Sequence, residues 1–290
     1  MFAPQFDYYR ASSVAEAAAL LAEHPEAKVL AGGHSLIPLL KLRLAAPSAL
    51  VDIGRIDSLR SILEESGTIE IGALTTHAEL ASSELLRSRA TALAEAAGMI
   101  GDPAVRNRGT IGGNVAHADP ASDLPAVLAC LGAEFRVTGG DGDRSVRASD
   151  FFEGLMSTAI GEGEILTSIG VPTVDSACGS AYAKFAHPAS RYAVIGAAAA
   201  LVVDEDGSCT CASVTLGGLV PAPVRATAVE EALVGTRLDA AAIASASGLT
   251  GEALDTDDVL GDVYASAEYR RSVAQVWVQR ALSSAAARCG

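Results

Sequence analysis

Hydrophobic positions along the chain occur partly as short continuous runs and partly at helical spacing, so both strands and helices are expected. The apolar runs predict strands at residues 28–31, 50–53, 69–73, 135–138, 165–171, 182–185, 193–203 and 209–216. Helical spacing predicts helices near residues 13–23, 36–40, 76–87, 91–100, 124–131, 226–233 and 269–287. These elements do not form a long series of regular βαβ units, which favours an α+β fold.

Polar residues mark several of the predicted helix starts. Ser13 and Glu16 have the spacing of a capping box, and Thr76 and Glu79 repeat it ahead of a second helix. Ser122 is the expected cap of the helix that follows it. At such positions a side-chain oxygen accepts a hydrogen bond from a backbone N–H that the first helical turn leaves free.

The chain of 290 residues is longer than a typical single domain, so two domains are the natural expectation. A predicted strand stops at Pro172, and the stretch 174–179 follows it as the expected boundary. We therefore predict one domain over residues 1–173 and a second over residues 178–288.

The composition narrows the class of protein. Hydrophobic residues make up 50% of the chain, which is enough for a packed core, and the formal charge of −14 speaks against a nucleic-acid partner. Residues 1–10 lack the basic region and apolar run of a signal peptide. The longest apolar run, 193–203, is shorter than the roughly 20 residues that cross a bilayer. We expect a soluble cytoplasmic protein without a membrane span.

The five cysteines are an odd number without a repeated spacing, which does not indicate a disulfide framework. Cys209 and Cys211 are two positions apart in a predicted strand, so we expect them to share one face of it as small core residues. The sequence lacks the four closely spaced thiolates that hold an iron–sulfur cluster. A redox function of this chain would therefore need a group other than a cluster of its own.

Two glycine segments combine backbone freedom with polar side chains: residues 31–35 (AGGHS) and residues 110–114 (TIGGN). Glycine lets the backbone adopt positive φ and approach a ligand, and successive N–H groups can then form a nest for phosphate. Ser35, Thr110 and Asn114 add polar side chains, so two such segments together could hold a pyrophosphate. Neither segment has the spacing of a dinucleotide fingerprint or a P-loop, and each alone is more often a tight turn.

Other polar residues admit different interpretations. His117, Asp119 and Asp123 are metal-ligand types, but their place between a loop and a helix favours helix-start hydrogen bonds over a metal site. His34 is a candidate general base, although a histidine in a phosphate-facing loop more often serves in hydrogen bonding or packing. The pattern leaves these alternatives open.

From the pattern alone, Lys184 is expected to be a solvated lysine on an edge strand and Tyr192 a core aromatic. The sequence contains no nucleophile elbow with serine, histidine and aspartate in order, and no cysteine with an activating context. Hydrolase chemistry is therefore unsupported.

Taken together, the two glycine segments resemble those of one protein family. Residues 31–38 with Arg43, and residues 108–125, are similar to the first and second FAD loops of the flavoprotein subunits of molybdenum hydroxylases, the xanthine oxidase family. Further segments match that family in the same order, namely residues 50–53, 71–76, 182–184 and 191–192. Within the family, His34 and the chain length resemble the medium subunit of aerobic carbon monoxide dehydrogenases.

The resemblance implies a PCMH-type FAD-binding domain of two α+β subdomains, followed by a small C-terminal α+β domain of the carbon monoxide dehydrogenase flavoprotein type. It implies that both glycine segments wrap the FAD pyrophosphate mainly through backbone N–H groups, while Asp123 contacts the adenosine or ribityl part. It places Lys184 at the flavin edge, where a cation favours the anionic reduced flavin, and Tyr192 against the isoalloxazine ring. The implied cofactor-binding residues are Ala31, Gly32, Gly33, His34, Ser35, Leu36, Thr76, Thr110, Ile111, Gly112, Gly113, Asn114, Asp123, Lys184 and Tyr192.

The resemblance further implies an oxidoreductase subunit that passes electrons from the iron–sulfur clusters of a partner through FAD to an external acceptor. The implied partners are an iron–sulfur small subunit and a molybdopterin large subunit, in a heterotrimer that symmetry can double. The large subunit oxidises the substrate, so no catalytic residue or metal ligand is expected in this chain. The alternatives are a flavin subunit of a purine, nicotine or N-heterocycle hydroxylase, a self-sufficient PCMH-type flavin oxidoreductase, and a binding module that has lost its cofactor. The final acceptor stays open among quinone, cytochrome, oxygen and NAD.

Overall fold

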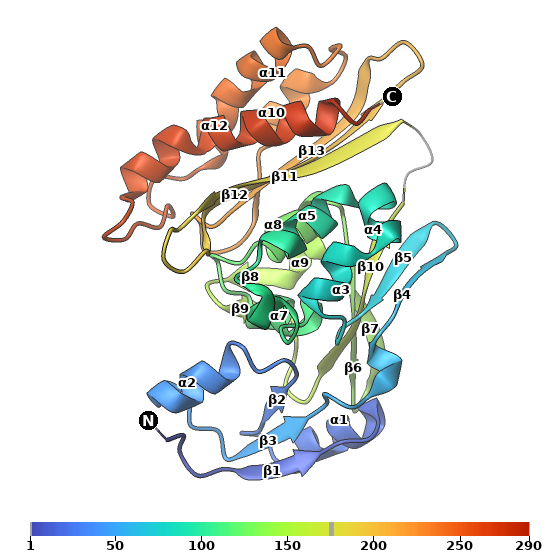
Figure 1. The fold of residues 1–290 in the computed structure, drawn as a ribbon, viewed down its shortest axis with the longest axis vertical. Helices are drawn as coiled ribbons and strands as arrows, with labels where there is room; N and C mark the ends of the chain where they lie inside the picture. The colour runs from blue at the N-terminus through green and yellow to red at the C-terminus, as the bar shows by residue number, and fades with distance from the viewer. Residues whose placement is uncertain (1, 174–176, 290) are drawn as a thin grey trace.

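The computed structural model describes residues 2–173 and 177–289, which form three tiers along the long axis of the molecule (Figure 1). Each tier has its own sheet, and helices accompany all three sheets. The expected α+β class is therefore confirmed. Residues 174–176 of the expected domain boundary lie outside the described residues.

The N-terminal tier is a small parallel sheet with two helices. Its elements are β1 (Asp7–Arg10), α1 (Val14–Glu23), β2 (Lys28–Leu30), α2 (Leu36–Leu42) and β3 (Ala49–Asp52), with the strand order β1-β3-β2. Ser13 caps α1 as expected, because its Oγ accepts a hydrogen bond from Glu16 N at 3.1 Å. The Glu16 carboxylate accepts from Ser12 N at 2.7 Å rather than from Ser13 N, so the second half of the capping box is shifted by one residue.

The central tier is built on an antiparallel sheet with one apolar face. Its strands follow the order β4 (Ile62–Glu65), β5 (Thr68–Gly72), β10 (Ile165–Pro172), β6 (Glu134–Gly139) and β7 (Gly142–Arg147). In β5 and β6 every second side chain is buried, namely Ile69 and Ile71 in β5 and Phe135 and Val137 in β6. These residues share one core with the helices of the tier.

Short helices and a small ribbon complete the central tier. They are α3 (His77–Ser82), α4 (Glu84–Arg89), α5 (Thr91–Met99), α6 (Pro103–Arg106), α7 (Ile111–His117), α8 (Leu124–Cys130), α9 (Ala148–Phe151), β8 (Phe152–Gly154) and β9 (Ser157–Thr158). The short helix η1 (Asp57–Leu59) precedes β4, and its Leu59 belongs to the core of the N-terminal tier. Helices α5 and α8 lie against the sheet of the C-terminal tier and so join the two tiers (Figure 1).

The C-terminal tier is an antiparallel sheet with helices on the face that points away from the central tier (Figure 1). Its elements are β11 (Cys178–Ala186), β12 (Ala193–Val203), β13 (Cys209–Gly217), β14 (Val224–Arg225), α10 (Thr227–Leu233), α11 (Ala240–Ser247), η2 (Gly248–Ala253) and α12 (Ala267–Ala286). Strand β12 contacts α12 on one side and α8 on the other, so most of its residues are buried. This explains why its sequence is an unbroken apolar run rather than an alternating one.

Two of the helix predictions need correction. The helix predicted over residues 76–87 is interrupted at Ser83, whose Oγ accepts from Leu86 N at 3.3 Å and so starts α4 as a separate helix. Ser122 does not cap α8, because its hydroxyl donates to Asn114 Oδ1 at 2.7 Å. Asp123 occupies the N-cap position instead, and its side chain accepts no capping hydrogen bond.

The prediction for Cys209 and Cys211 is wrong. Val202 pairs with Cys211 and Val203 with Cys209, so Thr210 is an extra residue that forms a β-bulge in β13. The bulge turns Cys209 into the core and leaves Cys211 exposed. Cys130, Cys209, Cys211 and Cys289 are free thiols.

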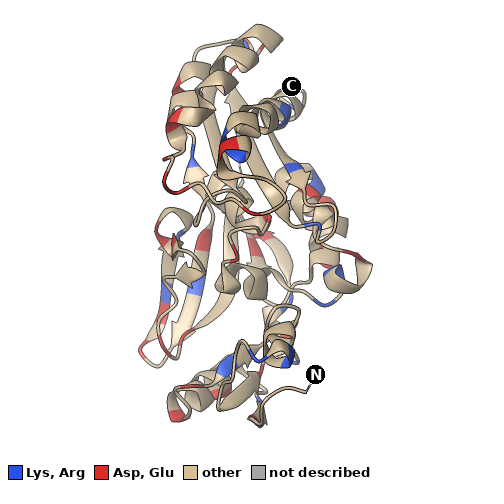
Figure 2. Ribbon diagram, turned by 90° about the vertical axis from the view of Figure 1, so that its left-hand side faces the viewer, with Lys and Arg blue, Asp and Glu red and all other residues tan. Residues whose placement is uncertain are grey.

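Charged residues of both signs are spread over the molecule. Lys and Arg lie interspersed with Asp and Glu over all three tiers rather than gathered in a basic stripe (Figure 2). Within residues 2–173 and 177–289, no helix combines the length and the apolar character needed to cross a bilayer.

Candidate functional site

The two glycine segments of the sequence meet in the structure. A Cβ built on Gly32 would lie 2.2 Å from Arg108 O and 3.0 Å from Gly109 Cα, so only glycine at this position allows the two backbones to approach this closely. Gly33 has a φ of 75°, in the left-handed region that favours glycine. The sequence Gly-Gly is therefore needed for both the contact and the turn.

The first segment presents unpaired backbone donors. It links β2 to α2, and Ile37 N donates to Gly33 O at 3.0 Å as α2 begins. In the part of the chain that the structure describes, the N–H groups of residues 32–35 have no protein acceptor within hydrogen-bond distance. Consecutive N–H groups without a partner are the donor set of an anion nest.

The second segment forms the start of α7 rather than a turn beside a strand. Thr110 is the N-cap residue, and its Oγ1 accepts from Gly113 N. The N–H groups of residues 111–114 all donate to acceptors of the chain itself, at distances of 2.9 to 3.2 Å. The N–H groups of residues 111–114 thus join α7 to the fold, and the binding of the pyrophosphate by residues 110–114 stays a prediction.

A cleft of about 860 Å³ lies where the three tiers meet, and its walls include both glycine segments. Most of the expected cofactor-binding residues line it. These are Ala31, Gly32, Gly33, His34, Ser35, Leu36, Thr110, Gly112, Gly113, Asn114, Asp123 and Tyr192.

Three expected residues lie outside the lining of the cleft. Thr76 forms the expected capping box with Glu79 at the start of α3 and pairs with Thr110 in an isolated β-bridge. Ile111 is fully buried in the core of the central tier. Lys184 lies behind Asp123, and its side chain is 3% exposed rather than solvated.

Asp123 is the buried acid of the cleft. Its Oδ2 accepts from Lys184 Nζ at 2.8 Å, and its Oδ1 accepts from Tyr182 Oη at 2.6 Å. Lys184 Nζ also donates to Met99 O at 3.3 Å. Burial raises the pKa of the Asp123 carboxyl, while Lys184 and Tyr182 oppose that rise. Lys184 and Tyr182 thus fix the carboxylate of Asp123 and join the central tier to β11.

Tyr192 and His34 are two further residues of the cleft lining whose surroundings bear on their predicted roles. Tyr192 is 45% exposed instead of being a core residue, and burial of the rest of it, followed by the charges of Asp119 and Asp123, raises the pKa of its phenol. His34 Nδ1 lies 3.3 Å from Gly32 O. This contact supports the hydrogen-bonding role of His34 over that of a general base.

The carboxylates considered as metal ligands have protein partners instead. Asp119 Oδ1 accepts from Ala121 N at 2.9 Å, which closes a turn before α8. Asp123 is occupied by Lys184 and Tyr182. In the described ranges 2–173 and 177–289, no three His, Cys, Asp or Glu residues are grouped so that they could hold a metal ion.

Sequence reasoning missed several residues of the cleft. Residues 160–166 line one wall, and Glu164 orders them by accepting from Gly161 N at 2.6 Å and from Arg144 Nε at 2.7 Å. Arg144 also lowers the pKa of Glu164. The sequence GEGE at 161–164 before a predicted strand is a turn signal that could have drawn attention to this wall.

His77 is a further missed residue of the cleft wall. It is 3% exposed, and among the described residues its Nδ1 has no hydrogen-bond partner. Its ring packs against Gly109, where an added Cβ would lie 2.8 Å from His77 Cδ2. Burial, with smaller contributions from His34 and Arg106, lowers the pKa of His77 from 6.5 to about 4.

We expect the free energy of unfolding to fall as the pH drops from 6.5 towards 4. In that range the unfolded chain binds a proton at His77 and the folded protein does not, which costs up to about 3 kcal/mol for a pKa lowered from 6.5 to about 4. Urea denaturation at pH 7 and pH 4.5 measures this loss. His77→Gln should lose less between the two pH values, and an equal loss in both proteins would contradict the assignment.

Two family models match the chain. Residues 4–174 match the FAD binding domain in molybdopterin dehydrogenase, and residues 180–285 match the CO dehydrogenase flavoprotein C-terminal domain. The first match alone spans more than half of the chain. Both domain types are those that the sequence resemblance implied.

Relatives of the whole chain agree with these matches. The carbon monoxide dehydrogenase medium chain of Afipia carboxidovorans is 42% identical over 289 residues, covering 99% of both chains. The 6-hydroxypseudooxynicotine dehydrogenase complex subunit alpha of Paenarthrobacter nicotinovorans is 38% identical, covering 97% of this chain and 95% of the relative. The solved carbon monoxide dehydrogenase of Hydrogenophaga pseudoflava has a chain that superposes with a TM-score of 0.94 at 40% identity, with full coverage of both. This chain therefore belongs to the family of FAD-binding medium subunits of the molybdenum hydroxylases.

Proposed function

We propose that this chain binds FAD in the cleft between its tiers and transfers electrons as the medium subunit of a heteromeric molybdenum hydroxylase. The observation that carries the proposal is the run of unpaired N–H groups at residues 32–35 in the wall of that cleft. A pyrophosphate offers the anionic oxygens that such donors need. The family membership supplies the flavin as the group to which the pyrophosphate belongs.

The other residues of the cleft fit the same ligand. Asp123 offers a fixed carboxylate for a hydroxyl of the ribityl or ribose part, and Tyr192 offers a half-exposed ring for the isoalloxazine. We propose that Lys184 acts on the flavin environment through Asp123, and that Thr76 and Ile111 support the second glycine segment from behind. Bound FAD supplies the redox chemistry, and the protein supplies its position and electrostatic surroundings.

The proposed assembly follows from the kind of relatives that the chain has. Two of them are named as a medium chain and a complex subunit, which supports a multi-subunit enzyme here. We propose an iron–sulfur small subunit and a molybdopterin large subunit as partners, in a heterotrimer or a dimer of heterotrimers, with an external electron acceptor. We also propose domains over residues 1–173 and 178–288 and a cytoplasmic location, to which the free thiols of Cys130, Cys209, Cys211 and Cys289 are suited.

Carbon monoxide is the proposed substrate of the complex, since a carbon monoxide dehydrogenase medium chain is 42% identical to this chain. The flavin subunit of an N-heterocycle hydroxylase is the second candidate, because the 6-hydroxypseudooxynicotine relative is 38% identical. Co-purifying the chain with its two partners and assaying the complex on carbon monoxide and on N-heterocycles distinguishes the two.

Flavin binding is tested on the purified chain alone. After incubation with excess FAD and desalting, we expect about one FAD per chain by visible absorbance, because the cleft has the donors for its pyrophosphate. FMN is the matched control, since it has the same ring without the pyrophosphate, and it should be retained far less. A chain that stays colourless after incubation with FAD would overturn the proposal.

A further inference from the structure

The hairpin between β11 and β12 ends in a loop, residues 187–192, that reaches the cleft. Arg191 and Tyr192 of this loop line the cleft. The sheet pairing ends at Ala186 and Ala193, so the whole loop lies beyond the β-ladder. Its conformation must therefore be fixed by contacts other than those of the sheet.

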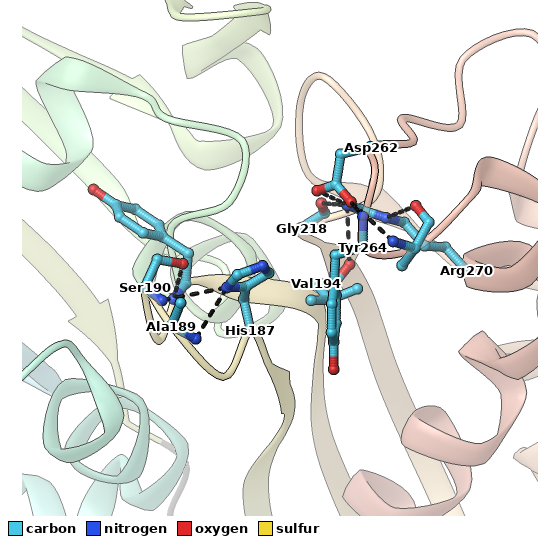
Figure 3. Close-up of polar contacts among 10 residues, drawn as sticks. His187, Ala189, Ser190, Val194, Gly218, Asp262, Tyr264 and Arg270 are labelled. Carbon is cyan, nitrogen blue, oxygen red and sulfur yellow. Dashed lines mark hydrogen bonds and ion pairs between the residues drawn. The ribbon is translucent and has the colours of Figure 1, made fainter.

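His187 is the centre of the hydrogen bonds within this loop. Its backbone N–H donates to Tyr192 O at 2.8 Å, and its carbonyl accepts from Arg191 N at 2.8 Å. Its ring Nδ1 accepts from both Ala189 N and Ser190 N, each at 3.2 Å (Figure 3). One residue thus holds both the base and the tip of the loop.

Two backbone donors at the tip of the loop, Ala189 N and Ser190 N, depend on one lone pair. Pro188 has no N–H, and Tyr192 N donates to Ser190 Oγ at 3.4 Å. The two N–H groups at the tip converge on Nδ1 of His187. This geometry requires Nδ1 without a proton, so the neutral ring carries its proton on Nε2.

The loop contains a backbone conformation that needs such support. Arg191 has a φ of 61°, in the left-handed region that residues other than glycine adopt uncommonly. It stands directly before Tyr192, so the direction of the tyrosine ring depends on it. A conformation of this kind persists where the surrounding contacts fix it, and here the hydrogen bond from Arg191 N to His187 O and the two hydrogen bonds from the loop tip to His187 Nδ1 do so together.

The ring of His187 is itself held from the C-terminal tier. It meets Tyr264 edge to face, with 4.6 Å between ring centroids. Asp262 Oδ1 accepts from Tyr264 N at 2.8 Å, and Arg270, which is 5% exposed, donates to Asp262 Oδ2 (Figure 3). Arg270 also donates to Gly218 O at 3.1 Å, which ties this network to the end of β13.

We propose that His187 is the positioning residue of the cofactor cleft: its Nδ1 lone pair holds the 187–192 loop so that Arg191 and Tyr192 face the flavin. That the loop residues face a flavin rests on the proposed function, whereas the fixing of the loop by His187 does not. His187 does not line the cleft, so it acts through the residues that it holds.

A matched pair of substitutions isolates the lone pair. In His187→Asn the amide oxygen can stand near the place of Nδ1, whereas in His187→Gln the polar end stands near the place of Nε2. Trypsin cleaves after Arg191 only when the loop opens, and this needs no flavin. We expect cleavage at Arg191, measured by mass spectrometry, to speed up on the order of tenfold in His187→Gln and to stay near the wild-type rate in His187→Asn.

Thermal unfolding of both variants shows whether the tier stays folded. If the two variants are cleaved at the same rate, whether fast or slow, the lone pair does not hold the loop and the proposal fails. The asparagine variant keeps the test valid when glutamine lowers stability, because rescue by asparagine cannot come from a general loss of packing.

The flavin readout then tests the positioning itself. With FAD bound, Tyr192 against the ring should quench flavin fluorescence, so His187→Gln is expected to fluoresce more strongly and to bind FAD roughly tenfold more weakly, while His187→Asn resembles the wild type. Unchanged fluorescence and affinity in a glutamine variant with an open loop would overturn the positioning role. A wild-type chain that binds no FAD would instead refute the proposed function, and the trypsin result would still decide whether His187 fixes the loop.

Discussion

Gly32→Ala is expected to abolish the retention of FAD while most of the fold survives. The new Cβ would lie 2.2 Å from Arg108 O, a backbone atom that cannot swing aside as a flexible side chain would. The two glycine segments must then separate, which displaces the N–H groups of residues 32–35 from their place in the cleft. We expect FAD binding to weaken at least about 100-fold, or about 2.7 kcal/mol, in a fluorescence titration.

Gly140→Ala is the matched control for this experiment. The chemical change is the same, but a Cβ at Gly140 meets no atom within 4 Å. Its stability and its affinity for FAD should equal those of the wild type. The stability cost of Gly32→Ala should stay at about 1–3 kcal/mol, as for other cases of local overpacking, so that lost binding is not lost folding. Wild-type affinity in Gly32→Ala would show that the close contact of the segments is not needed.

The elements that could be predicted from the sequence are those with a strong hydrophobic pattern. The predicted strand 193–203 has the bounds of β12, because that strand is buried on both faces and its apolar run is unbroken. Strand β7 was missed, since Val146 is its one buried residue and gives no alternation. Helix α11 was also missed, because its sequence AAAIASAS contains a single large apolar residue, Ile243.

The site was predictable where it depends on local chemistry. The two glycine segments do lie together in the cleft, as their composition and the family resemblance suggested. The sequence could not show that the N–H groups of residues 111–114 are already used, because two of their acceptors are the carbonyls of Ala73 and Thr75 on a distant segment. Local pattern identifies donors, whereas only the tertiary structure shows which of them remain free.

The burial of the charged Lys184 side chain was likewise not predictable from the local sequence pattern. As a lysine on the edge strand β11 it was expected to be solvated, yet its side chain is 3% exposed. The reason is Asp123, which comes from the start of α8 and supplies the buried counter-charge. No spacing in the sequence relates the two residues, and the family resemblance placed Lys184 at the flavin edge, so neither predicted the ion pair with Asp123.

Lys184→Met is expected to lower the free energy of unfolding by about 3–5 kcal/mol, the cost of leaving a buried charge without its partner. Lys184 Nζ lies 2.8 Å from Asp123 Oδ2, and the two side chains are 3% and 5% exposed. Methionine has a similar length but no charge, so Tyr182 alone would remain to stabilise the carboxylate. Urea denaturation of the wild type and the variant at pH 7 measures the difference.

The pH dependence of that loss shows whether charge is its cause. Burial already raises the pKa of Asp123 above the ordinary value of 3.8, and without Lys184 it should rise further, so that the folded variant holds a proton. A carboxyl group with a raised pKa in the folded state adds its full contribution to the free energy of unfolding below the pKa of the unfolded chain. That contribution is lost as the pH rises through the pKa of the folded state. The loss of unfolding free energy in Lys184→Met should therefore be smallest near pH 4 and grow towards pH 8.

Adding Asp123→Asn to Lys184→Met removes the carboxylate, so it should restore much of the stability and flatten this trend. If the double variant is as unstable as Lys184→Met at every pH, lost packing rather than an unpaired charge accounts for the effect.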